Sequence, residues 1–201
     1  MTVETMSRSE RRSPLASAAA QLEALPAGVR VRELPLLVQL DLRLDPAGPA
    51  ATAVAEVLGV AVPQTACTAV TAGDVTVLWL GPDEWLVVAP AGRTDLLESL
   101  DAAVGGRGAV VDVSAQRTTI SLSGPRARDL LAHGCAIDLH PRVAPRGTCV
   151  QTLLALTGVV LVVRDDTASD FWILVRSSFA RYLADWIVDA CTEYHEDHSW
   201  H

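Results

Sequence analysis

Residues 109–134, A-V-V-D-V-S-A-Q-R-T-T-I-S-L-S-G-P-R-A-R-D-L-L-A-H-G, carry the signals for a strand, a tight turn, a second strand and a helix. β-branched residues lie on both sides of the S-A-Q turn, which favours strands before and after it. Ser123 is expected to cap the helix, and Pro125 suits its first turn because an amide there would have no partner. We expect Gly134 to end the helix in the left-handed conformation.

The chain before this stretch follows a related pattern. Residues 29–34 and 37–44 alternate apolar and polar side chains, as strands do. Pro49 is expected to open a helix that ends at Gly59. Further apolar runs, separated by glycine and aspartate turns, predict strands at 67–71, 75–80 and 85–89 and a helix from about residue 94.

Landmarks in the two halves of the chain match in order. They are Gly48-Pro49 with Gly124-Pro125, Cys67 with Cys149, turns at Gly73 and Gly158, and Trp85 with Trp172. We therefore expect an α+β fold of two tandem pseudo-repeated β-β-α-β-β-β-α units, with largely antiparallel sheets covered by helices. The predicted organisation is an N-terminal arm at 1–28, units at 29–104 and 109–191, and a C-terminal tail at 192–201.

Composition limits the classes of partner. The formal net charge of -8 and the pI of about 5.0 argue against nucleic acid or an anionic membrane surface as a partner. Half of the 201 residues are apolar and the mean hydropathy is +0.28, which favours a buried contact with another protein. All 16 basic residues are arginine, so a phosphate-loop lysine and a Schiff-base lysine are excluded.

The cysteines and histidines offer the remaining candidate chemistry. Four widely spaced cysteines without a C-x-x-C pair fit reduced thiols in a cytoplasmic protein, although a pairing of Cys135 with Cys149 stays open. A Cys–His nucleophile pair would need Cys135 beside His133 or His140, but no third orienting group is identifiable. The last histidines, His195, His198 and His201, have the spacing of one helical face but not the H-E-x-x-H pattern of a zinc site.

We therefore expect no catalytic, cofactor-binding or metal-binding residue in this chain. Arg117 follows the S-A-Q turn, where an exposed guanidinium can grip a carboxylate, although a solvated surface charge is the simpler interpretation.

Four motifs carry a resemblance to a known family. They are R-R-S-P-L-A at 11–16, L-G-P-D-E-W-L at 80–86, V-D-V-S at 111–114 with Arg117, and L-S-G-P-R-A at 122–127. With them the chain resembles the gamma subunit of heterotetrameric sarcosine oxidase. More loosely, it is similar to the folate-binding fold of the aminomethyltransferase, or T-protein, of the glycine cleavage system.

The resemblance implies a non-catalytic assembly subunit in a cytoplasmic complex with alpha, beta and delta subunits. That complex oxidatively demethylates sarcosine to glycine and yields hydrogen peroxide with formaldehyde or 5,10-methylenetetrahydrofolate. FAD, FMN, NAD, zinc and tetrahydrofolate are expected on the other subunits. The arm would contact a partner through Arg11, Arg12, Ser13, Pro14 and Leu15. The alternative is a stand-alone folate-dependent one-carbon transfer protein of the aminomethyltransferase fold.

Overall fold

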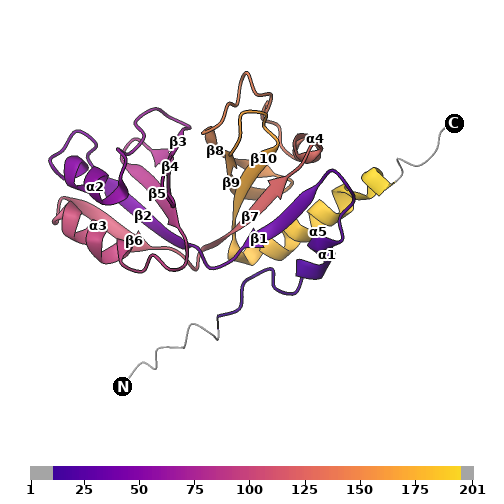
Figure 1. Ribbon diagram of the computed structural model, residues 1–201, viewed down its shortest axis with the longest axis horizontal. Coiled ribbons are helices and arrows are strands. Elements are labelled where there is room, and N and C mark those ends of the chain that lie inside the picture. The colour runs from indigo at the N-terminus through magenta and orange to yellow at the C-terminus, as the bar shows by residue number, and fades with distance from the viewer. Residues whose placement is uncertain (1–10, 196–201) are drawn as a thin grey trace.

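Two five-stranded antiparallel sheets form the molecule, and helices cover the outer face of each (Figure 1). The computed structural model describes residues 11–195. The first sheet has the strand order β1 (Arg30–Leu34), β7 (Arg117–Ser123), β10 (Asp170–Arg176), β9 (Thr157–Val163) and β8 (Cys149–Leu154). The second has the order β3 (Ala69–Ala72), β4 (Val75–Gly81), β5 (Glu84–Ala89), β2 (Val38–Leu44) and β6 (Gly108–Asp112).

The helices are short, and all but α1, which precedes β1, come after strands of the sheet they cover. They are α1 (Ala19–Glu23), α2 (Ala50–Leu58), α3 (Leu96–Val104), α4 (Ala127–Ala132) and α5 (Ala180–Ala190), with 3-10 turns η2 (Ser177–Phe179) and η3 (Thr192–His195). The expected mixture of helices with antiparallel sheets is confirmed. No helix in the described part of the chain is both long and apolar enough to cross a membrane.

Each sheet is completed by a strand from the other half of the chain. β1 pairs with β7, with Val31 opposite Leu122, and β6 pairs with β2, with Val110 opposite Leu42. The backbone therefore crosses between the sheets twice, from β1 to β2 and from β6 to β7. The first strand of each half thus lies in the sheet formed mainly by the other half, so the sheets do not coincide with units at 29–104 and 109–191. The division of the chain into those units stays a prediction.

Three apolar cores hold the layers together. The first sheet packs on α1, α4 and α5, and the second on α2 and α3. A third, smaller core lies between the inner faces of the two sheets. Its buried members are Leu78, Leu86, Val88, Cys149, Val160, Val162 and Leu174. Burial of such side chains from both sheets stabilises the contact between them.

Three local expectations are wrong. Ser123 is the last residue of β7, and Arg126 occupies the N-cap of α4, where its side chain makes no capping hydrogen bond. Gly134 does not adopt a left-handed conformation. A Cβ there would lie 2.6 Å from Cζ2 of Trp186, so the small residue is needed for packing. Gly158 lies inside β9, and the preceding turn is made by Ala155, with φ of 52°, and Leu156.

The two matched tryptophans do not occupy equivalent places. Trp85 is fully buried on the helix side of its sheet, and its indole donates to the carbonyl of Pro63 at 2.8 Å. Trp172 packs against the core between the sheets, with the guanidinium of Arg164 3.8 Å from its ring centroid. Because successive strand residues face opposite sides, a one-residue offset in alignment places the two rings on opposite faces.

Candidate functional site

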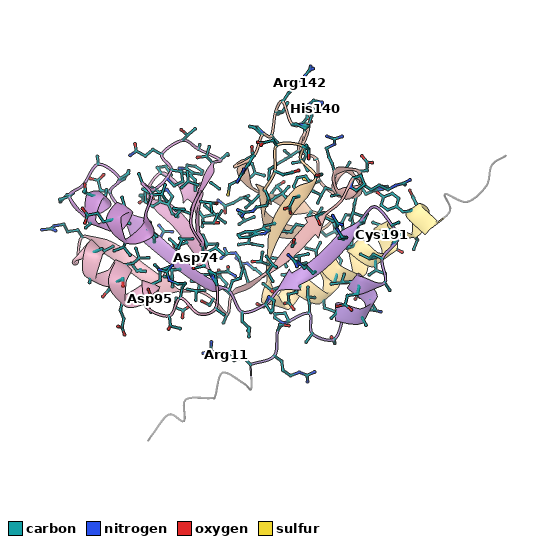
Figure 2. All side chains as sticks on the ribbon, in the orientation of Figure 1. Arg11, Asp74, Asp95, His140, Arg142 and Cys191 are labelled. Atoms are coloured by element: carbon teal, nitrogen blue, oxygen red, sulfur yellow. The ribbon has the colours of Figure 1, made fainter. Side chains whose placement is uncertain are left out.

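A groove of about 570 Å³ lies where the chain passes between the two sheets. We call it the crossing groove. Its lining comes from the arm, the β1–β2 connection, the β6–β7 turn and the start of η2, and comprises Arg11, Arg12, Pro14, Leu36, Leu37, Asp112, Ser114, Ala115, Arg117, Thr118 and Ser177. Figure 2 shows Arg11 beside this crossing. The structure thus brings together the arm motif and the V-D-V-S motif with Arg117, which are far apart in sequence.

Hydrogen bonds between the two crossings fix the shape of the groove. The carboxylate of Asp112 accepts from the amide of Ser114 at 2.9 Å, and the hydroxyl of Ser114 accepts from the amide of Gln39 at 3.0 Å. The side-chain amide of Gln39 donates to the carbonyl of Arg117 at 3.0 Å. Most polar groups of the V-D-V-S motif therefore hold backbone in place rather than project into the groove.

Ser177 fastens the same turn to the end of β10. Its amide donates to the carbonyl of Gln116 at 2.9 Å, and its hydroxyl donates to the carbonyl of Ala115 at 2.9 Å. The β6–β7 turn is therefore held from both sheets, which makes the groove wall a preorganised surface.

The start of the described arm is attached through the apolar side chain of Leu15 and the carboxylate of Glu33, and Ala18 and Leu22 are buried in the same core further along. Leu15 is only 1% exposed and packs in the core of the first sheet. Its amide donates to Oε1 of Glu33 at 3.3 Å, and the same oxygen accepts from the hydroxyl of Thr118 at 2.6 Å. The Leu15 side chain is therefore packed inside this chain, and the expected partner contact through Leu15 stays a prediction. Arg11, Arg12 and Pro14 are exposed at the groove.

Arg117 is half-buried and is not the solvated surface charge that we expected as the default. Burial, followed by the nearby charge of Arg176, lowers the pKa of the Arg117 guanidinium, while the carboxylates of Asp41 and Glu84 act in the opposite direction. Of these two carboxylates, Glu84 is already paired with Arg43, because a guanidinium nitrogen of Arg43 lies 2.6 Å from a carboxylate oxygen of Glu84. A partly desolvated cation interacts more strongly with an incoming anion than one in bulk water does.

The other chemical candidates from the sequence are not assembled into a site. Cys135 is buried, and the ring of His133 packs edge-on against Tyr194 with centroids 6.3 Å apart. Figure 2 shows His140 and Arg142 at the outer tip of a loop, where a ring nitrogen of His140 accepts from the amide of Arg142 at 3.2 Å.

No cluster of metal-ligating side chains occurs in the part of the chain that the structure describes. The side chains of His195, His198 and His201 lie outside the described residues, so the metal hypothesis for them stays a prediction.

Sequence reasoning missed three residues that build the groove. Gln39 is 1% exposed, although its place on the polar face of its strand indicated solvent. Glu33 binds both the arm and β7. Leu36 is 42% exposed and has a φ of 57°, which is unusual for leucine. None of these three features had a local signal, and the apolar L-P-L-L run that contains Leu36 would by itself favour burial.

Comparisons with known proteins agree on one family. The model of the sarcosine oxidase, gamma subunit family matches residues 43–193. The sarcosine oxidase subunit gamma of Corynebacterium sp. (strain P-1) is 39% identical over 195 residues, which cover 94% of this chain and 93% of that protein. The subunit of the same name from Arthrobacter sp. is 39% identical over 193 residues, with the same coverage of both chains.

Solved structures give the same picture. A chain of the heterotetrameric sarcosine oxidase from Corynebacterium sp. U-96, in complex with pyrrole 2-carboxylate, matches with a TM-score of 0.84 and 38% identity, covering 92% of this chain and 96% of that chain. Aminomethyltransferase T of the glycine cleavage system from Bartonella henselae matches at 16% identity and a TM-score of 0.60, over 85% of this chain and 48% of that one, so it shares the fold. The chain described here belongs to the sarcosine oxidase gamma subunit family.

Proposed function

We propose that this chain is the non-catalytic assembly subunit of a heterotetrameric sarcosine oxidase and binds its partner subunits through the crossing groove. The assembled complex would convert sarcosine to glycine and hydrogen peroxide, with formaldehyde or 5,10-methylenetetrahydrofolate as the one-carbon product. The alpha, beta and delta subunits would carry FAD, FMN, NAD, zinc and tetrahydrofolate, and the complex would be cytoplasmic. The solved relative is likewise a chain of a heterotetrameric sarcosine oxidase.

This proposal rests on a difference between two sets of groove residues: one set holds the β6–β7 turn in place, and the other presents charge to a partner. Asp112 and Ser114 are engaged in hydrogen bonds that hold the turn. The exposed Arg11 and Arg12 and the half-buried Arg117 surround the apolar side chains of the β1–β2 connection. This combination suits a partner segment that presents carboxylates beside apolar side chains.

Charge reversal at the groove tests the assembly role. Arg11→Glu with Arg12→Glu should reduce co-purification of the other subunits tenfold or more, because both exposed cations face the groove. Arg142→Glu, which makes half of this charge change, is the control, since this exposed arginine lies at a loop tip away from the groove (Figure 2). Equal loss in both variants would indicate a general effect of net charge. Full flavin content and turnover of a complex lacking this chain would contradict the assembly role itself.

A second candidate function is a stand-alone folate-dependent one-carbon transfer protein. One observation favours it: the groove holds a carboxylate, Asp112, together with three arginines. That function predicts that the isolated chain binds tetrahydrofolate. Calorimetry that detects no heat on titration of the isolated chain with tetrahydrofolate would remove this candidate and leave the assembly role standing.

We also infer that the chain arose from a duplicated unit. The order of elements after β1 and after β6 is the same, and each half contributes its first strand to the opposite sheet. The matched Gly-Pro helix starts and cysteines support this inference. The tryptophans do not, because Trp85 and Trp172 face opposite sides of their sheets.

A further inference from the structure

The seam between the two sheets places two cysteines opposite each other. Thr68, just before β3, and Thr148, just before β8, meet there in an isolated antiparallel bridge. Since antiparallel partners step in opposite directions, the next pair outward is Cys67 and Cys149. The amide of Cys149 donates to the carbonyl of Cys67 at 2.8 Å, which establishes that their backbones are adjacent.

This backbone spacing suits a disulfide. Residues in a hydrogen-bonded antiparallel pair have Cα atoms about 5.5 Å apart, inside the range of about 4.4–6.8 Å found for disulfide-bonded cysteines. The sulfur of Cys149 lies 3.8 Å from the carbonyl oxygen of Trp79, on the side of the seam where the second sheet begins. Trp79 in turn donates its amide to the carbonyl of Thr68, the neighbour of Cys67.

The two thiols differ in access. Cys67 is exposed and free, with a φ of 60°, whereas Cys149 is free but only 1% exposed. Burial, with a smaller contribution from the neighbouring Cys67, raises the pKa of the Cys149 thiol to about 12. Because Cys67 is exposed, an oxidant from solvent reaches it first. The raised pKa keeps the Cys149 thiol protonated and slows its attack, so its reaction with the oxidised Cys67 depends on the adjacent backbones.

We propose that Cys67 and Cys149 form a redox-sensitive clasp, a disulfide that joins the two sheets at their seam when the chain meets hydrogen peroxide. In the first step the Cys67 thiol takes one oxygen from peroxide, giving a sulfenic acid and water. In the second step the Cys149 sulfur attacks the Cys67 sulfur and displaces the hydroxyl, which leaves as a second water with the proton of the Cys149 thiol. Two thiols and one peroxide thus yield one disulfide and two waters.

The clasp would constrain the seam that the third apolar core otherwise holds alone. Its closure joins Cys67 to Cys149 in a loop that contains the end of the first half of the chain and the start of the second, so the oxidised chain has fewer unfolded conformations. We expect its melting temperature to rise by roughly 5–10 °C over that of the reduced chain. This inference rests on the seam geometry and is independent of the proposed assembly role.

The full chain is treated with equimolar hydrogen peroxide, remaining thiols are alkylated, and peptides are mapped without reduction. We expect a peptide joining Cys67 to Cys149, a loss of two hydrogens in the intact mass, and reversal by dithiothreitol. Cys67→Ser should abolish the cross-link without perturbing the fold, because this residue is exposed. The double variant Cys135→Ala with Cys191→Ala should retain it. Oxidation of Cys67 to sulfinic acid while Cys149 stays alkylatable under denaturing conditions, or any other pairing, would overturn the proposal.

Discussion

Gln39 and Arg117 join the two sheets at the crossing: the side-chain amide of Gln39 on β2 donates to the backbone carbonyl of Arg117 on β7 at 3.0 Å. Gln39 is 1% exposed, and its Oε1 is buried without a hydrogen-bond partner among the described residues. The amide therefore satisfies a carbonyl of the opposite sheet while the oxygen of the same group gains nothing. The stability of the protein should therefore depend both on the hydrogen bond that the Gln39 amide donates and on the volume that its side chain fills.

Two replacements of Gln39 separate the contribution of its hydrogen bond from that of its volume. Gln39→Ala should lower the free energy of unfolding by roughly 2–3 kcal/mol, because it leaves the Arg117 carbonyl unsatisfied and opens a void. Gln39→Leu keeps most of the volume and also removes the unpartnered oxygen, so we expect a smaller loss. Urea denaturation of both variants measures the difference. If alanine and leucine were equally destabilising, volume would not contribute.

Gly134 is expected to tolerate no side chain. A Cβ would lie 2.6 Å from Cζ2 of Trp186 and 2.9 Å from the amide nitrogen of Ala155. Gly134→Ala should therefore cost about 1–3 kcal/mol of stability through displaced packing. Gly158→Ala is the control, since a Cβ there has no atom within 4 Å, and it should be neutral or slightly stabilising. Thermal melts of the two variants compare them, and similar melting temperatures would contradict the packing argument.

Asp165 should give stability a dependence on acidic pH. Burial acts to raise the pKa of its carboxyl, but hydrogen bonds from Thr167, from the amide and hydroxyl of Ser169 and from the amide of Asp170 outweigh it and lower the pKa to about 2. Because the folded pKa lies below the unfolded value of 3.8, the stabilisation is present above about pH 4 and is lost as pH falls toward 2.

The experiment compares wild type with Asp165→Asn from pH 6 to pH 2. The difference in unfolding free energy should be largest near pH 6 and shrink as the pH approaches 2. Asp166→Asn is the matched control, because the neighbouring Asp166 is exposed. A gap between wild type and Asp165→Asn that stays constant over this range would show that ionisation of Asp165 is not the cause.

Leu15 anchors the arm to the body of the chain. Leu15→Ala should lower the unfolding free energy by about 2–4 kcal/mol, because the side chain is 1% exposed in the core of the first sheet. Leu156→Ala is the control, since Leu156 is 86% exposed, and it should change stability by less than about 0.5 kcal/mol. Equal stabilities of the two variants, measured by urea denaturation, would mean that the arm is not docked in solution.

The sequence alone determined most of the elements, although not all of their ends, because their signals are local. Alternating side chains defined β2, and Pro49 with Gly59 bounded α2; Gly59 ends that helix with a φ of 72°. Predictions failed where a residue is chosen for a contact with a distant part of the chain, because local patterns carry no information about such contacts. Gly134 is small because Trp186 packs against it, and the sequence could not reveal that contact.

The tertiary structure decided which strands complete which sheet. Backbone hydrogen bonds are the same for any antiparallel partner, so no local pattern assigns β1 to β7 or β6 to β2. That exchange creates the crossing, buries Gln39, and brings the arm beside Arg117. It also accompanies a seam at which Cys67 lies opposite Cys149, although the sequence separates them by more than a third of the chain. Periodicity and turn residues act over a few positions, whereas these contacts arise only when two finished sheets pack face to face.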